Sequence, residues 1–265
     1  MTDAKYGTAE EILAKAKTAE GKKFRDIDHH GRLAKGKGSI GNVIEESFFE
    51  YQVNNRAEPD FKEAGIELKV TPYIKNGAKI HAKERLVLNI INYEKEYRQS
   101  FETSSFWHKN QKLLLMFYEY IKGVEKGDLS IHKSVLYEYP EKDLLIIRDD
   151  WAKIITKIRS GKAHEISEGD TEYLGACTKG ATKDTNWVAQ PCSSFRAQRR
   201  AYCFKQPYMT YLLNTYIFGD QHDENIITSP ELLEHQSFED FIVSKIKTYF
   251  GRSQEELCSQ LNLKT

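Results

Sequence analysis

The sequence contains one short pattern of charged residues that could hold a metal ion beside a phosphodiester. Asp60 follows Pro59, six residues separate it from Glu67, and Lys69 comes two residues later. Alternate side chains of an extended strand share a face, so Glu67 and Lys69 would lie side by side. If Asp60 arrives from the preceding turn, two carboxylates can bind a hard cation such as Mg²⁺, and the ammonium can offset phosphate charge and help deprotonate a water. The pattern is therefore compatible with phosphodiester hydrolysis.

A simpler interpretation of the same residues is also open. Asp, Glu and Lys are common, and short motifs produce many false matches. Glu67 and Lys69 on an exposed strand face would more often form a plain ion pair than part of a nuclease site. Taken by itself, the pattern favours the ion pair.

The elements that must position these residues can be predicted from the flanking sequence. Residues 66–73 alternate between apolar and polar side chains, which is typical of a half-buried strand. A capping box of Thr8 and Glu11 predicts a first helix, and the apolar spacing of residues 40–48 predicts a second. Further strands are expected at 85–92, as a central strand, at 112–120, where a helix is the alternative, and at 130–137. Further helices are expected at 151–159 and from about Ser237 and Ser253. Helices flanking a mixed sheet indicate an α/β or α+β fold.

Composition excludes several classes of protein. The chain has 265 residues, of which 40% are hydrophobic and 29% charged, as in ordinary globular proteins and unlike fibrous or wholly disordered ones. Its apolar runs are far shorter than the about 20 residues of a membrane span, and no secretory signal is visible. The four cysteines include no Cys-x-x-Cys pair. We therefore expect a cytoplasmic protein that contacts no membrane and has no disulfide framework or zinc site.

Basic residues are concentrated in one segment, although 39 basic residues balance 39 acidic ones. Residues 177–216 contain six basic residues and one acidic residue, whereas residues 217–265 contain nine acidic and four basic residues. This distribution predicts a basic surface for a polyanion. Two solvated faces of opposite charge are an equally weighted alternative.

Longer segments resemble the MutH family, which joins a mismatch-repair nicking endonuclease to type II restriction enzymes that cut GATC. The segments that carry the resemblance are 41–45, 59–69, 101–109 and 172–174. The restriction branch is the more similar one, through residues 83–95, 117–123, 161–165 and 177–181. The resemblance covers about residues 8–260 and implies a PD-(D/E)xK restriction-endonuclease-like core with two lobes around a DNA-binding cleft. We expect a single domain over 1–265, with a catalytic lobe at about 1–110 and a recognition lobe at about 111–265.

The resemblance implies a metal site built on the first motif. Asp60 and Glu67 would bind Mg²⁺, which Mn²⁺ would be able to replace, and the Leu68 carbonyl would add a ligand. Glu45 would be a further active-site carboxylate that supports the metal or its waters. Without the resemblance, Glu45 is simply the polar side of an amphipathic helix.

The resemblance also implies roles for lysines near the scissile phosphate. Lys69 would orient the attacking water, and Lys109 would stabilise charge that develops on the phosphorane. Without the resemblance, Lys109 is a solvated lysine after a short helix. Lys37 and Gly38 match a Gly-rich segment near the DNA backbone, where the alternative is an ordinary flexible loop.

Base recognition is expected in the carboxy-terminal half of the chain. In the family a loop from this half enters the major groove, where donor and acceptor patterns distinguish the bases. Thr178 and Lys179 match that loop. Phosphate contacts, which position a protein without reading sequence, are expected for Arg196, Arg199, Arg200 and Lys205.

Two positions depart from the mismatch-repair branch. That branch has a tyrosine associated with sensing adenine methylation where this sequence has Cys203, or Tyr202 if the alignment slips by one residue. We therefore expect cleavage whether or not the adenine carries an N6-methyl group. At Cys177 and Thr178 the mismatch-repair relatives carry Arg-Pro, so their individual base contacts do not transfer.

The sequence thus predicts a Mg²⁺-dependent type II restriction endonuclease that hydrolyses double-stranded DNA 5′ of the guanine in GATC, leaving 5′-phosphate and 3′-hydroxyl ends. One alternative is a noncatalytic GATC-binding regulatory module, against which the intact Asp60, Glu67 and Lys69 set argues. The other is a mismatch-repair nickase with a MutL-like activator, against which the restriction-branch similarity argues. Because one active site cuts one strand, we expect a second protomer or a second MutH-like domain for double-strand cleavage.

Overall fold

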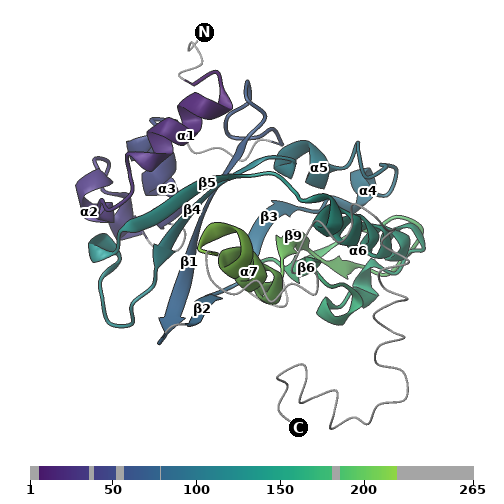
Figure 1. The fold of residues 1–265 in the computed structure, drawn as a ribbon. Coiled ribbons are helices and arrows are strands. Elements are labelled where there is room, and N and C mark those ends of the chain that lie inside the picture. Colours follow the sequence, from purple (N-terminus) through teal and green to yellow (C-terminus); the bar gives the residue numbers. More distant parts are fainter. Residues whose placement is uncertain (1–5, 36–38, 52–56, 78, 181–185, 220–265) are drawn as a thin grey trace, which may run out of the picture. The chain divides into compact units, whose positions relative to one another are not determined.

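A computed structural model describes residues 6–35, 39–51, 57–77, 79–180 and 186–219 (Figure 1). The chain divides into two units, Met1–Phe218 and Gly219–Thr265, and the elements below lie in the first. The strands are β1 (Glu67–Asn76), β2 (Lys79–Ala82), β3 (Leu86–Ile90), β4 (Leu113–Glu119), β5 (Ile131–Tyr137), β6 (Leu174–Thr178), β7 (Trp187–Val188), β8 (Ala197–Gln198) and β9 (Arg200–Phe204). The α-helices are α1 (Ala9–Lys17), α2 (Phe24–Ile27), α3 (Ser39–Asn42), α4 (Tyr93–Glu96), α5 (Ser105–Asn110), α6 (Glu141–Arg159) and α7 (Gln206–Leu212).

Short helical turns complete this unit. Two are π-helical, η2 (Val43–Phe48) and η6 (Leu213–Ile217), and four are 3₁₀ turns, η1 (Arg32–Lys35), η3 (Lys126–Asp128), η4 (Ala163–Glu165) and η5 (Glu168–Asp170). The helices predicted near Ser237 and Ser253 lie outside the described residues. No helix in the described ranges is long and apolar enough to cross a bilayer.

The large sheet, in the order β2-β1-β4-β5, contains the motif strand β1. β1 runs parallel to β4, with Glu67 opposite Leu113, and β5 runs antiparallel to β4. The strands predicted at 66–73, 112–120 and 130–137 are therefore confirmed, and the helical alternative for 112–120 is wrong. The continuous apolar sequence of β4 follows from its place inside the sheet, where both of its faces are covered.

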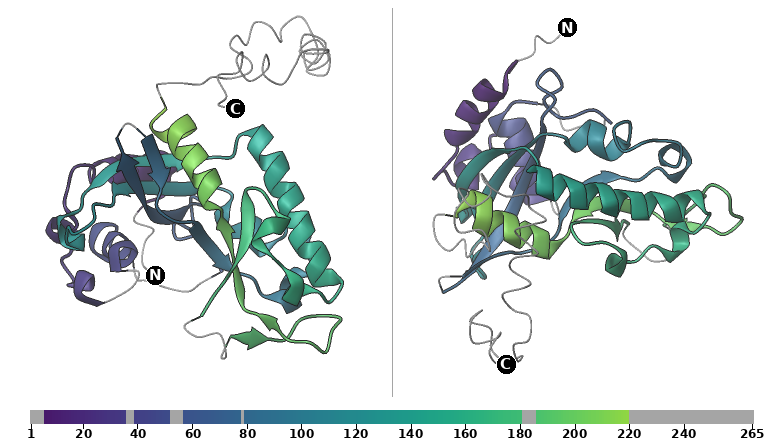
Figure 2. Two further views of the ribbon diagram at one scale, coloured as in Figure 1. Left: turned by 90° about the horizontal axis from the view of Figure 1, so that it is seen from below. Right: turned by 45° about the vertical axis from the view of Figure 1, so that its right-hand side comes forward.

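Two hydrophobic layers cover the large sheet on opposite sides. On one side, Ile12 of α1, Phe24 of α2 and Ile44 of η2 pack with Leu114 and Met116. The alternate β4 residues at 113, 115 and 117 pack with α6, α7 and the second sheet. Figure 2 shows the amino-terminal helices and the α6–α7 pair on opposite sides of the strands. β1 is predicted to be buried on one face only, and this is wrong. Leu68 on one face packs in the first layer, and Tyr73 on the other face packs in the second.

The first helix begins as its sequence indicates. The Thr8 hydroxyl accepts a hydrogen bond from the Glu11 N–H (3.2 Å), and the Glu11 carboxylate accepts one from the Thr8 N–H (3.2 Å). The capping box is therefore confirmed. The predicted second helix is also present, as α3 followed by η2.

The small sheet, in the order β3-β9-β6, lies beside α6. β3 is an edge strand with Ile90 55% exposed, so the interpretation of residues 85–92 as a central strand is wrong. Its run of apolar residues has another cause: Leu86 and Leu88 face the main core, while Val87 packs against a small cluster on the other face. The helix predicted at 151–159 is confirmed but begins earlier, at Glu141.

The chain passes between the two sheets more than once. β1 and β2 lie in the large sheet, β3 in the small sheet, β4 and β5 again in the large sheet, and β6 and β9 in the small one. A lobe boundary at residue 110 therefore does not separate the sheets, because β3 precedes it and β4 follows it. The single domain over 1–265 stays a prediction, since 220–265 lie outside the described residues.

Candidate nuclease site and DNA-binding surface

A tight turn brings Asp60 back beside the start of β1. Phe61 and Ile66 exchange backbone hydrogen bonds (2.9 and 3.2 Å), and Gly65 between them has φ +66°. This left-handed conformation strains residues that carry a Cβ, so glycine suits the position. The turn allows the Asp60 carboxylate to accept a hydrogen bond from the Leu68 N–H (3.0 Å). The six residues between Asp60 and Glu67 are thus the length of this turn.

Glu67 lies at the centre of the motif and is only 2% exposed. Its Oε1 pairs with Nζ of Lys69 (2.6 Å), as the strand alternation predicts. Its Oε2 accepts a hydrogen bond from the Asp60 N–H (3.2 Å) and lies 3.5 Å from Nζ of Lys109. Burial raises the pKa of Glu67, and the neighbouring Asp60 acts in the same direction, whereas the two ammonium groups oppose this shift. A buried carboxylate held between two lysines is not the exposed ion pair of the simpler interpretation.

Lys109 reaches this site from α5, far from β1 in sequence. Ser104 caps the helix by accepting a hydrogen bond from the Trp107 N–H (3.1 Å), and Lys109 lies in its last turn. Its ammonium also donates to the Glu58 carbonyl (3.1 Å), and its side chain is only 12% exposed. The interpretation of Lys109 as a solvated lysine is therefore wrong.

Glu45 approaches the motif from η2 on the amino-terminal side. Burial raises the pKa of Glu45 to about 7, and the negative charges of Asp60 and Glu67 add to this effect. The electrostatic coupling shows that Glu45 shares the surroundings of the two motif carboxylates. Glu45 is therefore more than the polar side of a helix.

The donor set fits a hard divalent cation. No three His, Cys, Asp or Glu side chains in the described parts of the chain are arranged to hold a metal as they stand. Both Glu67 oxygens are engaged by ammonium groups. The negative charge of Asp60 raises the pKa of both Glu45 and Glu67, so a bound cation would relieve the repulsion among the three carboxylates.

Leu68 is placed to add a backbone oxygen to this set. The N–H and C=O of one residue in an extended strand point to the same edge. The Leu68 N–H points to Asp60, whereas the Glu67 N–H donates to the Lys112 carbonyl at the edge shared with β4. The Leu68 carbonyl therefore faces the side on which Asp60 lies.

The predicted DNA contacts fall into three groups. Lys37 and Gly38 lie outside the described residues. Thr178 is exposed at the end of β6, and the backbone of Lys179 continues the pairing by donating to the Arg199 carbonyl (2.8 Å). Arg196 and Arg199 are also exposed, at either side of β8. These four residues stay predicted contacts.

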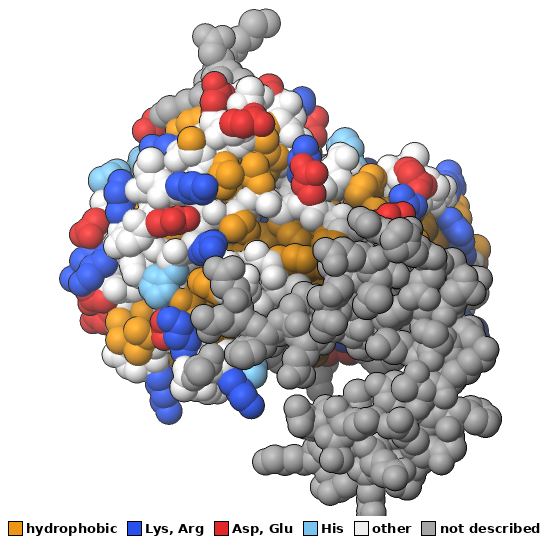
Figure 3. All heavy atoms as spheres, in the orientation of Figure 1, with side chains coloured by type: hydrophobic (Ala, Val, Ile, Leu, Met, Phe, Trp, Pro, Cys, Tyr) orange, Lys and Arg blue, Asp and Glu red, His pale blue; other side chains and the backbone are white. Residues whose placement is uncertain are grey.

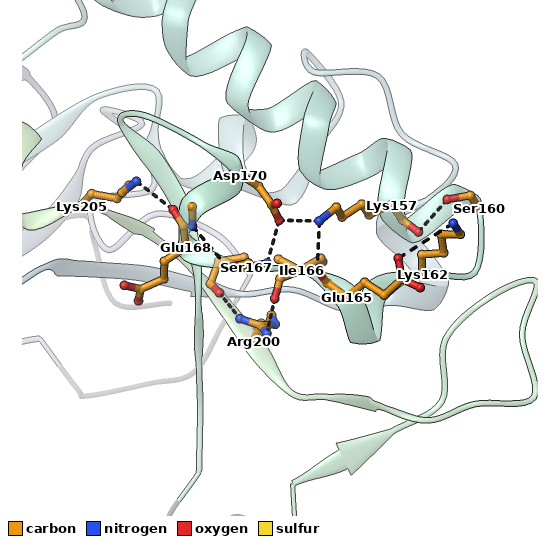
Figure 4. A network of polar contacts seen from close by, with 12 residues as sticks. Lys157, Ser160, Lys162, Glu165, Ile166, Ser167, Glu168, Asp170, Arg200 and Lys205 are labelled. Carbon is orange, nitrogen blue, oxygen red and sulfur yellow. Dashed lines mark hydrogen bonds and ion pairs between the residues drawn. The ribbon is translucent and has the colours of Figure 1, made fainter.

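Arg200 and Lys205 make contacts with the backbone that the sequence does not predict. The Arg200 guanidinium donates to the carbonyls of Ala176 (2.6 Å) and Ile166 (2.5 Å). The Lys205 ammonium donates to the carbonyls of Glu168 (2.8 Å) and Thr171. Figure 4 shows both side chains directed at the segment around Ser167. Both side chains thus bind backbone carbonyls, and their predicted phosphate contacts stay a prediction.

Cys203 is corrected as a DNA contact. It is 1% exposed and packs with Cys177 and Ala201 on the face of the small sheet that is turned away from the main core. Strand alternation sends its neighbour Tyr202 to the opposite face, into the main core. Neither thiol nor phenol is therefore accessible to a base in this conformation.

Several groups that hold the site together have no clear signature in the sequence. Glu58 contributes only its carbonyl, which no side-chain pattern reveals. Glu96 lies in a charged stretch that looks solvated, yet it is 1% exposed and accepts hydrogen bonds from the first residue of α5. Gly65, the residue immediately before Ile66, could have been found, since a glycine between an acidic residue and a strand is a turn signal.

Comparison with known proteins agrees with this arrangement. The model of the family described as DNA mismatch repair enzyme MutH matches residues 49–150, which include β1, α5 and the motif turn. This segment is therefore similar to the MutH family. The mixed α/β architecture around it agrees with the PD-(D/E)xK nuclease-like fold of MutH proteins.

Similarity to whole MutH-related proteins extends beyond that segment. The type II restriction enzyme Sau3AI of Staphylococcus aureus is 41% identical over 262 residues, which are 97% of this chain and 53% of that enzyme. The DNA mismatch repair protein MutH of Shewanella woodyi is 26% identical over 215 residues, 78% of this chain and 91% of that protein. A second Shewanella MutH is 25% identical over 189 residues, covering 71% of this chain and 82% of its own length. The chain thus spans about half the length of the restriction enzyme and most of the MutH proteins.

Proposed function

We propose that this chain is a sequence-specific DNA endonuclease that hydrolyses the phosphodiester 5′ of the guanine in GATC and requires Mg²⁺. The observation that carries this proposal is the position of Glu67, which lies beside Asp60 and between the ammonium groups of Lys69 and Lys109. Two anions and two cations that converge from a turn, a strand and a distant helix match the needs of phosphate chemistry. The predicted products carry 5′-phosphate and 3′-hydroxyl ends.

Asp60, Glu67 and the Leu68 carbonyl would hold Mg²⁺, with Glu45 supporting the ion or its waters. When bound, the ion would supply a Lewis acid that lowers the pKa of water and offsets phosphate charge. Lys69, on the same face as Glu67, would orient the attacking water. Lys109 would donate to a phosphate oxygen as charge develops there. Mn²⁺, which accepts the same oxygen ligands, would substitute.

The noncatalytic alternative is less well supported by the site. A module that only binds GATC has no need to bury Glu67 between two lysines, because the buried carboxylate costs free energy without contributing to binding. In the described structure Glu67 pairs directly with Lys69, whereas Asp60 joins them through the backbone: its N–H donates to Glu67, and its carboxylate accepts from the Leu68 N–H.

One observation favours a second candidate, a mismatch-repair nickase. The chain matches 91% of the length of a Shewanella MutH but only 53% of the restriction enzyme. The higher identity to Sau3AI, 41% against 26%, favours the restriction activity. A single catalytic site also cuts only one strand, so double-strand cleavage would need a second protomer or a second MutH-like domain.

Digestion of a supercoiled plasmid by the purified chain tests the proposal and separates the alternatives. We expect Mg²⁺-dependent linear fragments whose ends map 5′ of guanine in GATC. Nicked circles alone would support the nickase, and binding without any cleavage would support the regulatory module. A plasmid without GATC is the control and should stay intact.

Methylation tolerance is a separate part of the proposal. On the alignment that the family resemblance implies, Cys203 stands where the mismatch-repair branch has its methyl-sensing tyrosine, or Tyr202 does if the alignment slips by one residue, and both are buried. Duplexes with and without N6-methyladenine at one GATC site should therefore be cut at similar rates. Strong protection of the methylated duplex would contradict this expectation.

A further inference from the structure

Helix α5, which delivers Lys109 to the predicted catalytic site, is held at its first residue by a buried glutamate. The Ser105 N–H donates to both oxygens of Glu96 (3.1 and 3.3 Å). The same carboxylate accepts a hydrogen bond from the hydroxyl of Tyr202 (3.2 Å), in the middle of β9. Glu96 therefore joins the helix of Lys109 to the small sheet, which also carries the predicted base-contacting residues.

Ring packing and a second set of hydrogen bonds also connect α5 to the small sheet. The rings of Phe106 in α5 and Tyr202 have centroids 5.6 Å apart. Asn89 of β3 donates to the Ser105 hydroxyl (3.1 Å) and accepts from Asn110 (2.8 Å), so it holds both ends of α5. The orientation of α5 thus depends on two strands of the small sheet.

The burial of Glu96 is difficult to explain by stability alone. Glu96 and Tyr202 are 1% and 0% exposed, and within the described residues no lysine, arginine or histidine forms an ion pair with Glu96. A buried charge without a counter-ion is unfavourable unless strong hydrogen bonds satisfy it. Here those bonds come from the start of α5 and from strand β9 of the small sheet, so their effect is to fix one relative to the other.

We propose that Glu96 is a positioning residue that couples the small sheet to Lys109 through Tyr202 and Ser105; this inference rests on the proposed endonuclease function. Thr178 and Lys179 lie at the end of β6, which pairs with β9 over residues that include Tyr202. Correct base contacts at that end fix β9, and the hydrogen-bond chain then holds Lys109 against Glu67. Discrimination between GATC and altered sites therefore depends partly on Glu96.

The first test measures the position of Lys109 without DNA or metal. Amine acylation followed by mass spectrometry should modify Lys109 severalfold faster in Glu96→Gln and Tyr202→Phe than in the wild-type chain, because its ammonium leaves Glu67 and Glu58. Tyr93→Phe is the matched control, since it removes another buried tyrosine hydroxyl, which donates to the Gln198 carbonyl (2.6 Å). Unchanged Lys109 labelling in both Glu96→Gln and Tyr202→Phe would overturn the inference, whatever the activity of the chain.

The second test measures cleavage of a GATC duplex and of duplexes with one altered base pair. We expect Glu96→Gln and Tyr202→Phe to lower kcat on GATC by about tenfold or more, as displaced catalytic groups do, with KM changed less than about twofold. The ratio of GATC to altered-site cleavage should fall too, which a merely structural role would not cause. The double variant should be no slower than the slower single variant, because both act through one chain.

Three outcomes separate the two proposals. If the wild-type chain cuts GATC and Glu96→Gln and Tyr202→Phe cut it equally well, the proposed role of Glu96 is wrong and the endonuclease proposal stands. If the wild-type chain does not cut, the endonuclease proposal fails and the labelling result alone decides the position of Lys109. Equal losses in Tyr93→Phe would show a general effect of removing buried hydroxyls and would overturn the coupling. Thermal unfolding of each variant ensures that rates are compared for folded protein.

Discussion

Glu67 is the residue on which the chemistry of the site depends, because the groups around it hold their positions through it. Lys69 and Lys109 contact different oxygens of its carboxylate, and the Asp60 backbone donates to one of them. Removing Glu67 would therefore take away the carboxylate that both ammonium groups contact, whereas removing Lys69 would leave one carboxylate oxygen without its ammonium donor.

The first prediction follows from this arrangement. Glu67→Ala or Lys69→Ala should lower kcat by at least about 10²-fold, the scale at which single catalytic groups act, while Kd for a GATC duplex changes little. Lys75→Ala is the matched control: it removes a lysine from the same strand whose partner is Glu119 (3.2 Å), outside the site. Cleavage assays and fluorescence anisotropy measure the two quantities. Parallel loss of binding and cleavage would instead indicate a structural role for the motif.

The second prediction concerns Glu45 and pH. Its pKa rises from 4.5 to about 7 in the folded protein, so between these values the folded chain keeps a proton that the unfolded chain has released. The free energy of unfolding of the metal-free protein should therefore fall as pH rises through this interval. Glu45→Gln, which cannot ionise, should lack this contribution. Thermal melts from about pH 5 to 8 check the sign, and a wild-type melting temperature that rises relative to the variant would contradict it.

The same shift predicts the pH dependence of metal binding. A protonated Glu45 cannot support a cation, so stabilisation by Mg²⁺ should increase as pH rises through about 7. In Glu45→Gln this increase should be smaller.

Residue types revealed part of the site and concealed the rest. Glu67 and Lys69 could be paired from the sequence because strand alternation is a local property. Lys109 reached the site only through the family resemblance, since its contact with Glu67 spans 42 residues of chain and depends on how α5 packs. The backbone contacts of Arg200 and Lys205 could not be predicted, because a sequence shows charge but not which backbone carbonyls lie within reach.

Among the elements, the turn before β1 decides whether Asp60 can join Glu67. Gly65 has φ +66°, and a Cβ added to it would meet no heavy atom within 4 Å, so the strain of a substitution there comes from the backbone. Gly123, in the connection between β4 and β5, has φ +85° and is equally open. Gly65 lies in the turn next to Glu67, whereas Gly123 lies far from the motif along the chain.

The third prediction uses this pair. Gly65→Ala and Gly123→Ala should each lower the free energy of unfolding by about 1–2 kcal/mol, the cost of a left-handed conformation for a residue with a Cβ. Only Gly65→Ala should also lower kcat, because only that turn sets the position of Asp60. Denaturant unfolding and cleavage assays check both. Equal kcat losses in the two variants would show that strain anywhere in the unit affects the site.

The type and position of most helices and strands could be predicted, whereas the parts of the chain that pack against them could not. Capping and alternation are local, so α1, β1 and β5 lie where the sequence places them. The run at 85–92 contains the edge strand β3, which has one hydrogen-bonded neighbour. Other parts of the chain pack on both of its faces, and this tertiary property gives the same apolar pattern as a central strand.

At the scale of the whole chain, the net charge of zero hides how the basic residues are used. Acidic and basic side chains are interspersed on the face drawn in Figure 3. Within the basic segment, Arg196 and Arg199 are exposed, whereas Arg200 binds backbone carbonyls. Only some of these charges are therefore available to a polyanion.

The fourth prediction distinguishes arginines that contact phosphates from an arginine that binds backbone carbonyls. Arg196→Ala or Arg199→Ala should weaken binding to any duplex and reduce the slope of log affinity against log salt by about 1, since one phosphate contact is lost. Arg200→Ala should leave that slope unchanged and lower the melting temperature, because two buried carbonyls lose their donor. Anisotropy titrations at several salt concentrations, together with thermal melts, measure both effects. A reduced slope in Arg200→Ala would support it as a phosphate contact.

The order in which the chain visits its two sheets has a practical consequence for dissecting the protein. β3 of the small sheet is inserted between β2 and β4 of the large one. No single cleavage of the polypeptide can yield two fragments that each keep a complete sheet. Recognition and hydrolysis therefore cannot be recombined as portable modules by cutting and fusing at one point, and grafting a new specificity onto this scaffold would have to proceed by substituting residues within the intact unit.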